Sequence, residues 1–510
     1  MCLLTASFSV ENLWTTDASS SVHLRIDGNC PQDPITVHQM FMDSVNKYGA
    51  FNAMSTKRNG IWEHVTFKEY YRLCRQAAKS FIKLGLERFH TVGILGFNSQ
   101  EWFISAVGTV FAGGIITGIY STNSPEACHF IASDCKMDII VVENQKQLEK
   151  IIQIWENLPH LKAVVQYKGN IQHKHPNLYT WEEFMELGRD ISDTHLDGLI
   201  NSQKPNQCCV LIYTSGTTGS PKGVMLSHDN ITWTTSQASL AGDMIPAEIQ
   251  QESIVSYLPL SHIAAQIYDL WTGIRWGEHV YFAEPDALKG SLVDTIREVQ
   301  PTSHMGVPRV WEKIMESIKD VLAQSGTVQK IVMSWAMSLS LEKNLSHFSG
   351  LKSFLPSLAD YLVLSKIRKA LGFSHCQKHF SGAAPISLET LEFFLGLNIP
   401  LYEAYGMSET TGPHFMSGPQ THRLQCCGRV VPGCQVKLDN KDHEGNGEIC
   451  FWGRNVFMGY LNMESKTKEV LDEEGWLHSG DIGKMDPEGF LQVTGRIKGT
   501  INKVSISNLP

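Results

Sequence analysis

The sequence predicts an α/β protein whose sheets are mainly parallel and carry helices on both faces. Between about residues 50 and 400, short apolar runs alternate with amphipathic stretches, which is typical of strands joined by crossover helices. From about Gly428 onward the apolar runs are separated by Gly, Asn and Asp turns, as in residues 439–447. This change indicates a smaller, more antiparallel β subdomain. With 42% hydrophobic and 19% charged residues, the chain can build large cores, and dominant disorder is excluded.

The individual elements follow from the apolar pattern, taken in chain order. Residues 91–96 are predicted to form a strand, and the next helix is predicted to start at Ser99. The apolar segment 102–120 begins within that helix. Residues 138–142 predict a second strand. The helix after it is expected to carry Leu148, Ile151, Ile152, Trp155 and Leu158 on one face. Further strands are predicted at 161–167, 210–213, 279–282 and 399–402.

The segment 102–120 carries no charged residue and is long enough to cross a bilayer. Gly108, Gly113, Gly114 and Gly118 interrupt it, and no basic flank marks a cytosolic side. We therefore expect a buried helix that leads into a buried strand rather than a membrane span.

Charge and cysteine content bear on the expected partners and cellular compartment of the protein. Lys and Arg number 43 against 52 Asp and Glu, for a formal charge of −9, so nucleic acid is not expected as a partner. The twelve cysteines form no C-x-x-C pair and no disulfide-like framework, which favours a reduced, cytoplasmic protein. Glu11 and Asp17 precede the first basic residue, Arg25, so residues 1–35 are interpreted as a tail rather than a targeting signal.

The most informative segment is 213–223, Tyr-Thr-Ser-Gly-Thr-Thr-Gly-Ser-Pro-Lys-Gly, which follows an apolar strand. Glycines let backbone N–H groups approach an anion, hydroxyls add hydrogen bonds, and Lys222 supplies a positive charge for a polyphosphate. The spacing is not that of the Walker A motif, because a glycine follows the lysine. The alternative interpretation is a polar surface loop, for which Gly, Ser and Thr are common residues.

This segment resembles the phosphate loop of the adenylate-forming superfamily, which includes acyl-CoA synthetases, firefly-type luciferases and peptide-synthetase adenylation domains. Other motifs of that superfamily follow in the same order, and the resemblance covers about residues 50–498. They are the histidine motif at 257–262, the adenine-side loop at 381–385, the adenine and magnesium motif at 402–412, the ribose motif at 476–481 and the entry to the interdomain hinge at 495–498.

The resemblance implies the large N-terminal domain of the acyl-CoA synthetase and luciferase-like fold, with two helix-covered sheets and a small β subdomain. It places this AMP-binding domain at 36–495, with the β-rich part from about residue 428, and the start of the hinge with a divergent tail at 496–510. It also implies ATP and Mg²⁺ as cofactors and CoA as co-substrate. Lys222, His262 and Glu409 are the implied catalytic residues, and Glu409 with Thr217 the implied metal ligands.

The implied roles agree with the chemistry. A carboxylate attacks the α-phosphorus of ATP, and Lys222 and Mg²⁺ neutralise the charge that gathers on the phosphoryl oxygens. Magnesium prefers oxygen ligands such as those of Glu409. The residues implied to bind the nucleotide are Tyr213, Thr214, Ser215, Gly216, Thr217, Thr218, Gly219, Ser220, Pro221, Gly382, Ala383, Glu403, Ala404, Tyr405, Gly406, Met407, Ser408, Asp481 and Arg496.

Within that set, Asp481 is expected to accept hydrogen bonds from both ribose hydroxyls. Tyr405 is expected to offer its ring to adenine, and Arg496 to contact ribose or phosphate. Considered one at a time, Asp481 is also typical of a turn, Glu409 of a helix start and His262 of a structural histidine. The order and spacing of the motifs favour the functional interpretation.

A helical stretch that includes residues 334–371 separates the 308–311 segment from the adenine-side loop. Such an insertion resembles long-chain fatty acyl-CoA synthetases, and the 402–412 motif most resembles their bubblegum-type branch. A scaffold helix pair is the alternative. An apolar tunnel suits a long acyl chain, since each buried CH₂ contributes about 0.8 kcal/mol. Peripheral attachment to membranes is an expectation from the substrate, although no basic amphipathic helix demands it. Acyl-chain length and oligomeric state stay undefined.

The end of the chain departs from the family pattern. Relatives continue after the hinge into a mobile C-terminal domain with a catalytic lysine, whereas residues 499–510 do not resemble that domain, and Lys503 is not assigned its role. The expectation is a truncated or alternatively spliced form with lowered turnover, because a closing domain supplies charge and excludes water. Two alternatives to a CoA ligase stay open: a catalytically impaired nucleotide- or fatty-acid-binding isoform that modulates a full-length enzyme, and adenylation without CoA.

Overall fold

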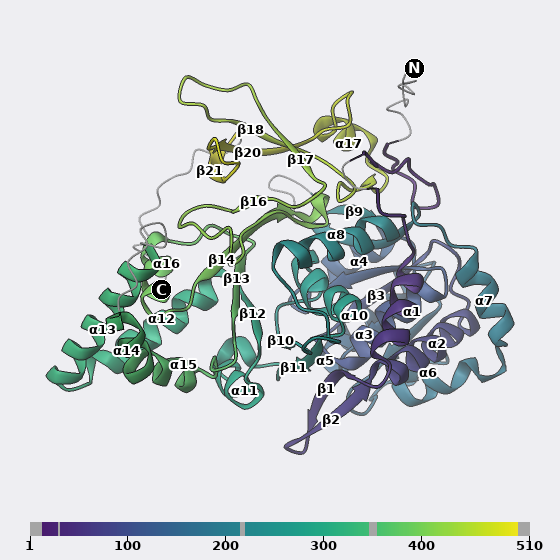
Figure 1. Cartoon of the computed structure of the whole chain (residues 1–510). Helices are drawn as coiled ribbons and strands as arrows, with labels where there is room; N and C mark the ends of the chain where they lie inside the picture. The colour runs from purple at the N-terminus through teal and green to yellow at the C-terminus, as the bar shows by residue number, and fades with distance from the viewer. Residues whose placement is uncertain (1–12, 29–30, 215–219, 346–353, 498–510) are drawn as a thin grey trace.

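The computed structural model describes residues 13–28, 31–214, 220–345 and 354–497. The predicted α/β class is confirmed: two large layers of strands carry helices, and a small antiparallel sheet lies over their ends. Figure 1 shows the larger sheet and its helices at the right, the helices between residues 292 and 396 at the left and the small sheet at the top.

The larger sheet has eight strands in the order β19-β9-β8-β4-β3-β5-β6-β7. Strands β8 to β7 in this order are parallel, whereas β9 and β19 are antiparallel to their neighbours. Their bounds are β3 Thr91–Leu95, β4 Ile115–Ile119, β5 Met137–Val142, β6 Ala163–Gln166, β7 Leu178–Thr180, β8 Cys208–Thr214, β9 Lys222–Ser227 and β19 Gly459–Tyr460. Strands β3, β4 and β5 are buried along their whole length, as expected for parallel strands covered on both faces.

Helix α3 of this layer begins where the sequence predicts it. Ser99 accepts a hydrogen bond from the Trp102 N–H (3.1 Å) and so caps α3. The segment 102–120 forms the buried helix α3 followed by the buried strand β4, as predicted. The helices are α1 Val37–Tyr48, α2 Phe67–Lys83, α3 Gln100–Phe111, α4 Pro125–Asp134, α5 Gln145–Ile152, α6 Trp181–Leu187, α7 Asp193–Asn201 and α8 His228–Ala241. Within the described ranges, no helix combines the length and apolar character that crossing a bilayer requires.

Two predicted elements end or begin elsewhere. Helix α5 ends at Ile152, so Trp155 lies in a separate 3₁₀ turn and Leu158 follows it. Pro159 disfavours the helical conformation of Leu158, although the apolar spacing continues. The strand predicted at 399–402 begins only at Leu401, because Pro400 has no N–H to donate to a neighbouring strand.

The second layer consists of two sheets that adjoin at β10 and β12, where the Thr302 N–H donates to Ser253 O (2.9 Å). One sheet has the order β10-β11-β1-β2, and the other has the order β12-β13-β14-β15-β16. The bounds are β1 Asn52–Arg58, β2 Ile61–Thr66, β10 Ser253–Ser256, β11 His279–Phe282, β12 Ser303–Gly306, β13 Lys378–Gly382, β14 Leu401–Met407, β15 Gly412–Met416 and β16 Arg429–Val430.

Helices of this layer include the insertion that the sequence predicts as helical. The described part of that stretch consists of α12 after its first turn, 308–311, then α13 to α15 with a π-helical turn, Asp360–Leu364. The bounds are α9 Ile263–Ala265, α10 Thr272–Trp276, α11 Leu292–Val299, α12 Pro308–Ala323, α13 Thr327–Leu345, α14 Phe354–Ala359, α15 Ser365–Leu371 and α16 Leu388–Gly396.

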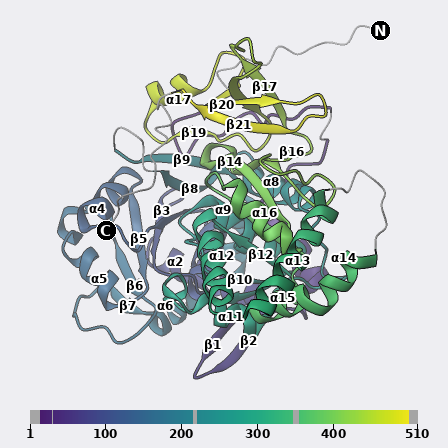
Figure 2. The ribbon, with the colours of Figure 1, turned by 90° about the vertical axis from the view of Figure 1, so that its left-hand side faces the viewer.

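The small sheet has the order β17-β18-β20-β21 and is antiparallel throughout. Its strands are β17 Gln435–Asp439, β18 Gly447–Trp452, β20 Leu477–Met485 and β21 Leu491–Arg496, and helix α17 spans Glu464–Val470. Figure 2, turned by 90°, again shows this sheet lying above β14 and α8. The small sheet therefore covers the top of both large layers in this view.

A buried ion pair ties the segment after β18 to the large layer. Arg454 donates to Asp229, at the start of α8, through Nε (3.0 Å) and Nη2 (2.6 Å). Burial raises the pKa of Asp229, and the guanidinium of Arg454 opposes that shift. We expect Arg454→Met to lower the free energy of unfolding by about 3–5 kcal/mol, because it leaves a buried carboxylate without its cation. Denaturant unfolding followed by tryptophan fluorescence measures this.

Lys468→Met is the matched control. Lys468 pairs with Glu464 on the surface of α17, with side chains 61% and 64% exposed, and an exposed pair contributes about 1 kcal/mol or less. Equal losses in the two variants would contradict the anchoring role of Arg454.

Candidate active site

Strands β8 and β9 form the hairpin that carries the predicted phosphate loop. Thr214 at the end of β8 pairs with Lys222 at the start of β9, and Ser220 and Pro221 lead into β9. The predicted nucleotide-binding residues Ser215, Gly216, Thr217, Thr218 and Gly219, with Thr217 also a predicted metal ligand, lie outside the described residues. The Tyr213 hydroxyl donates to Asp134 on α4 (2.6 Å), so this predicted site residue anchors the base of the loop.

Lys222 and Glu409, distant in sequence, lie on either side of one tyrosine. The Lys222 Nζ lies 4.5 Å from the centre of the Tyr460 ring. The Tyr460 hydroxyl donates to Glu409 Oε1 (2.6 Å), and Glu409 is only 6% exposed. Burial, together with the charge of Glu409, raises the pKa of Tyr460 far above its usual value. The predicted phosphate-binding cation and metal-binding carboxylate are thus brought together.

Sequence reasoning missed Tyr460. It lies on the two-residue strand β19, in the second half of the chain, which pairs with β9, in the first half. A strand this short has no periodic pattern of its own, so only comparison of related sequences could have signalled its position.

Asp481 joins two other predicted site residues. Its Oδ2 accepts from the Tyr405 hydroxyl (2.8 Å), and its Oδ1 accepts from Arg496 Nε (2.7 Å). These side chains come from β20, β14 and β21. A carboxylate offers about four acceptor positions, so Asp481 can accept further hydrogen bonds while Tyr405 and Arg496 hold its orientation. Burial, and secondly the charge of Asp481, raises the pKa of Tyr405.

An apolar cavity of about 80 Å³ lies on the other side of β14. Six predicted site residues line it: His262, Gly382, Ala383, Ala404, Gly406 and Met407. The apolar part of the lining comes from several elements of the second layer and from α8, and it includes Ala238, Met244, Ile267, Met305, Phe380 and Met416. The predicted histidine motif and the predicted adenine-side loop therefore lie at one cavity.

Strand β14 separates two environments. Successive side chains of a strand point to opposite faces, so Glu403 and Tyr405 share the face that contacts Asp481, whereas Ala404 and Gly406 line the cavity. Ser381 lies opposite Glu403 in register. Among the described residues, Ser381 Oγ and one buried oxygen of Glu403 have no hydrogen-bond partner. Such orphaned polar atoms fit a ligand with polar edges on this face, as a purine base has.

The backbone around β14 restricts which residue types fit at two positions. A Cβ at Gly406 would come within 1.9 Å of Gly412 O, so only glycine allows β15 to fold back this closely. Ala383, just after β13, has a φ of +70°, a conformation that costs a non-glycine residue energy and is found at functional sites. Ser408 is buried in the helical turn Ser408–Thr410 that also carries Glu409.

Two predicted site residues have ionisation shifted by burial. Burial raises the pKa of Glu403 to about 7. Burial lowers the pKa of His262, which favours the neutral imidazole. His262 Nδ1 accepts from the Ala264 N–H (3.2 Å), which leaves the proton on Nε2. The ring is therefore a hydrogen-bond donor at the cavity rather than a fixed cation.

Comparisons with known proteins identify the family of the chain. The family model described as AMP-binding enzyme matches residues 41–461. The chain belongs to this family of AMP-binding enzymes. It is 65% identical to long-chain-fatty-acid–CoA ligase ACSBG1 of Bos taurus and 64% identical to that of Homo sapiens, in each case over 98% of this chain and 69% of the relative. It is 57% identical to long-chain-fatty-acid–CoA ligase ACSBG2 of Xenopus laevis, over 98% of this chain and 68% of the relative.

These identities place this AMP-binding enzyme in the bubblegum-type branch of the long-chain acyl-CoA synthetases. Solved structures share the fold at lower identity. The anthranilate CoA ligase AuaEII in complex with anthranoyl-AMP superposes with a TM-score of 0.66 at 19% identity, over 91% of this chain and 78% of that chain. The N-terminal domain of FACL13 from Mycobacterium tuberculosis gives 0.66 at 18% identity, over 90% of this chain and 99% of that chain.

Proposed function

We propose that this AMP-binding enzyme activates long-chain fatty acids with ATP and transfers the acyl group to CoA. The fatty carboxylate attacks the α-phosphorus, giving acyl-adenylate and pyrophosphate, and the CoA thiol then displaces AMP. The observation that carries the proposal is the division made by β14, with polar Tyr405 and Asp481 on one face and the apolar cavity on the other. A fatty acid and a nucleotide need these two environments side by side. The names of the bubblegum-type relatives agree with this substrate class.

The residues would act as follows. Lys222 would neutralise phosphoryl oxygens as charge develops, and Glu409, oriented by the Tyr460 hydroxyl, would supply an oxygen ligand for Mg²⁺. Thr217 is the second magnesium ligand that the family resemblance supports. Asp481 would accept the ribose hydroxyls, and His262, neutral and protonated on Nε2, would donate to an oxygen of the reacting carboxylate or phosphate.

Product analysis tests the reaction. With ATP, Mg²⁺, palmitate and CoA, we expect palmitoyl-CoA and AMP in equal amounts by mass spectrometry. Acyl-adenylate without thioester would limit the proposal to adenylation. ADP as product, or thioester formation without ATP, would overturn it.

Filling the cavity should change which acids react. Ala238 lines the cavity from α8 and is 6% exposed. We expect Ala238→Phe to raise KM for palmitate tenfold or more, on the order of the loss of two or three buried CH₂ contacts, with a smaller change for octanoate. Leu240→Phe, on the same helix but 55% exposed, is the control. An unchanged chain-length profile in Ala238→Phe would show that the acyl chain binds elsewhere.

We also propose that the protein works in the cytoplasm, in peripheral contact with membranes. None of the ten described cysteines forms a disulfide, as is usual in a reducing compartment. Helix α13 turns Met333 and Ala336 toward the core and leaves Val328, Ile331 and Trp335 exposed by 74%, 64% and 43%. Their spacing of three and four residues puts them on one stripe, which the sequence analysis did not recognise.

The lipid surface is the partner that this stripe fits. Long-chain fatty acids reside in bilayers, and tryptophan favours the membrane interface. The same helix carries both Lys330 and Lys343 and the acidic Glu342, so the apolar stripe rather than the charge carries the argument. Docking there would place the enzyme where its substrate is.

Vesicle sedimentation tests this contact. We expect the double variant Ile331→Ser, Trp335→Ser to bind anionic phosphatidylserine vesicles at least fivefold more weakly, since about 25 cal/mol is lost per Å² of apolar surface withdrawn from lipid. Activity on micellar palmitate should be retained. Ile61→Ser, which removes an apolar side chain 70% exposed on β2, is the control. Equal vesicle binding by all three proteins would contradict the role of α13.

A further inference from the structure

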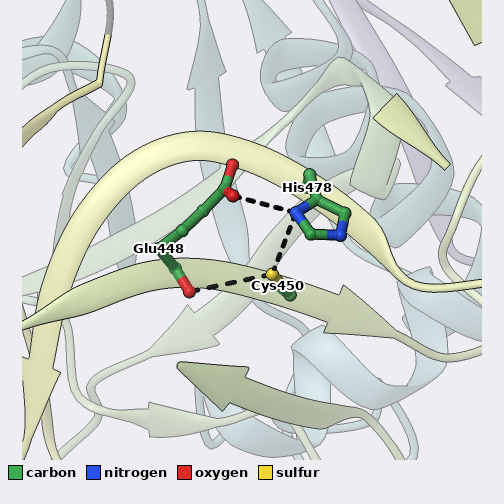
Figure 3. A group of neighbouring side chains, drawn as sticks. All are labelled: Glu448, Cys450 and His478. Carbon is green, nitrogen blue, oxygen red and sulfur yellow. Dashed lines mark hydrogen bonds and ion pairs between the residues drawn. The ribbon is translucent and has the colours of Figure 1, made fainter. Parts of the chain in front are cut away.

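Three side chains of different chemistry converge in the small sheet, away from the groups that face the cavity. Glu448 and Cys450 are two residues apart on β18, and His478 lies opposite Cys450 on β20. Figure 3 shows Glu448 and Cys450 turned toward the imidazole of His478. His478 Nδ1 lies 2.8 Å from Glu448 Oε2 and 3.5 Å from Cys450 Sγ. The oxygen, nitrogen and sulfur atoms all lie within 4.8 Å of one another.

The distances suit a metal ion of moderate softness. Zn²⁺ binds thiolate at about 2.3 Å, imidazole at about 2.0 Å and carboxylate at about 2.0–2.2 Å, in a tetrahedron whose ligand atoms are then roughly 3.5 Å apart. The sulfur to nitrogen distance of 3.5 Å already has this value. The nitrogen to oxygen distance must open to about 3.3 Å, which a rotation of the Glu448 carboxylate about its Oε1, the acceptor of the Gly480 N–H (3.0 Å), can provide.

The surroundings of the cluster support a bound cation. Cys450 is buried, whereas the side chains of Glu448 and His478 are 15% and 24% exposed, so an ion can enter from the solvent side and a water can complete its coordination. Asp472 Oδ2 lies 3.4 Å from the other ring nitrogen of His478. A carboxylate behind a metal-binding imidazole fixes the ring and its tautomer.

Positive charge nearby comes from Lys437. Its Nζ lies 3.1 Å from Asp472 Oδ2, so that charge is already balanced by an acidic side chain behind the histidine. A dication held by one carboxylate and one thiolate would be neutral overall, and the pair of Lys437 and Asp472 would add no net charge.

We propose that Glu448, Cys450 and His478 form a binding site for Zn²⁺ or another thiophilic divalent cation. On binding, the Cys450 thiol gives its proton to solvent and coordinates as thiolate. His478 coordinates through Nδ1 and carries its proton on Nε2, where it donates to Asp472. No electron transfer is involved. The site is separate from Mg²⁺ binding at Glu409, because Mg²⁺ requires oxygen ligands and a thiolate does not suit it.

Cobalt spectroscopy on the full chain tests the site, since Co²⁺ replaces Zn²⁺ and gives a thiolate-to-metal charge-transfer band in the near ultraviolet. With Co²⁺ under reducing conditions we expect such a band, its removal by one equivalent of Zn²⁺ and no removal by Mg²⁺. Cys450→Ser should abolish the band, and His478→Gln should weaken Co²⁺ binding at least tenfold. Cys427→Ser is the control, because Cys427 is a more exposed thiol that lies outside the cluster.

The outcomes are decisive in either direction. A band lost in Cys450→Ser and retained in Cys427→Ser supports the site. Absence of the band in the unmodified protein, or its persistence in Cys450→Ser, overturns it. If Cys450→Ser does not fold, as judged by circular dichroism, unchanged Co²⁺ affinity in folded His478→Gln overturns it equally.

Discussion

Glu409→Gln is expected to lower fatty-acid-dependent ATP–pyrophosphate exchange by about a hundredfold or more. The substitution keeps the size of the side chain and an oxygen that can accept from the Tyr460 hydroxyl, 2.6 Å away in the native structure. It removes the negative charge that a magnesium ligand needs. Loss of one preorganised electrostatic contact in an active site typically costs a factor of 10² to 10³. Exchange of labelled pyrophosphate into ATP measures the effect.

Tyr460→Phe separates the charge of Glu409 from its orientation. It keeps the ring beneath Lys222 and removes only the hydrogen bond to Glu409, so we expect a loss of about tenfold. Thermal unfolding of both variants should match that of the native protein. Normal exchange in Glu409→Gln would remove Glu409 from the catalytic residues, and an equal effect of both variants would assign it a purely structural role.

Asp481→Asn is expected to lower kcat/KM for ATP by about ten- to a hundredfold, mainly through KM. A hydrogen bond to a charged group contributes about 1.5–3 kcal/mol, and Asp481 would make such bonds with the ribose. The asparagine also places an N–H₂ group toward either Tyr405 or Arg496, both of which donate to Asp481 in the native structure. Steady-state kinetics with varied ATP at saturating palmitate measure the split between KM and kcat.

Tyr405→Phe is the control for Asp481. It keeps the aromatic face and removes one hydrogen bond to the carboxylate, so KM for ATP should rise less than in Asp481→Asn. An unchanged KM for ATP in Asp481→Asn would show that the nucleotide does not bind on this face of β14.

Local elements were predictable because their signals are local. The cap at Ser99 and the glycine-interrupted apolar segment led to α3 and β4 as the structure has them. The boundaries of α5 and β14 failed where a proline overrides the apolar pattern, at Pro159 and Pro400. Apolar spacing reports which residues are buried, and it does not report where the backbone changes conformation.

The motifs name candidate site residues but not their arrangement. The motifs named Lys222 and Glu409, but the tyrosine that lies between them comes from β19, a strand defined only by its pairing with β9. Likewise, the sequence indicated Asp481 as a ribose ligand without indicating that Tyr405 and Arg496 already bind it. Which face of β14 meets the small sheet depends on tertiary packing, for which a single strand carries no signal.

ATP–pyrophosphate exchange in the absence of CoA tests the central claim most directly, because it reports adenylation alone. The site described above predicts exchange that requires Mg²⁺ and palmitate, that is weak with acetate or benzoate, and that is lost in Glu409→Gln. ATP binding without palmitate-dependent exchange would contradict the claim that this chain activates long-chain fatty acids.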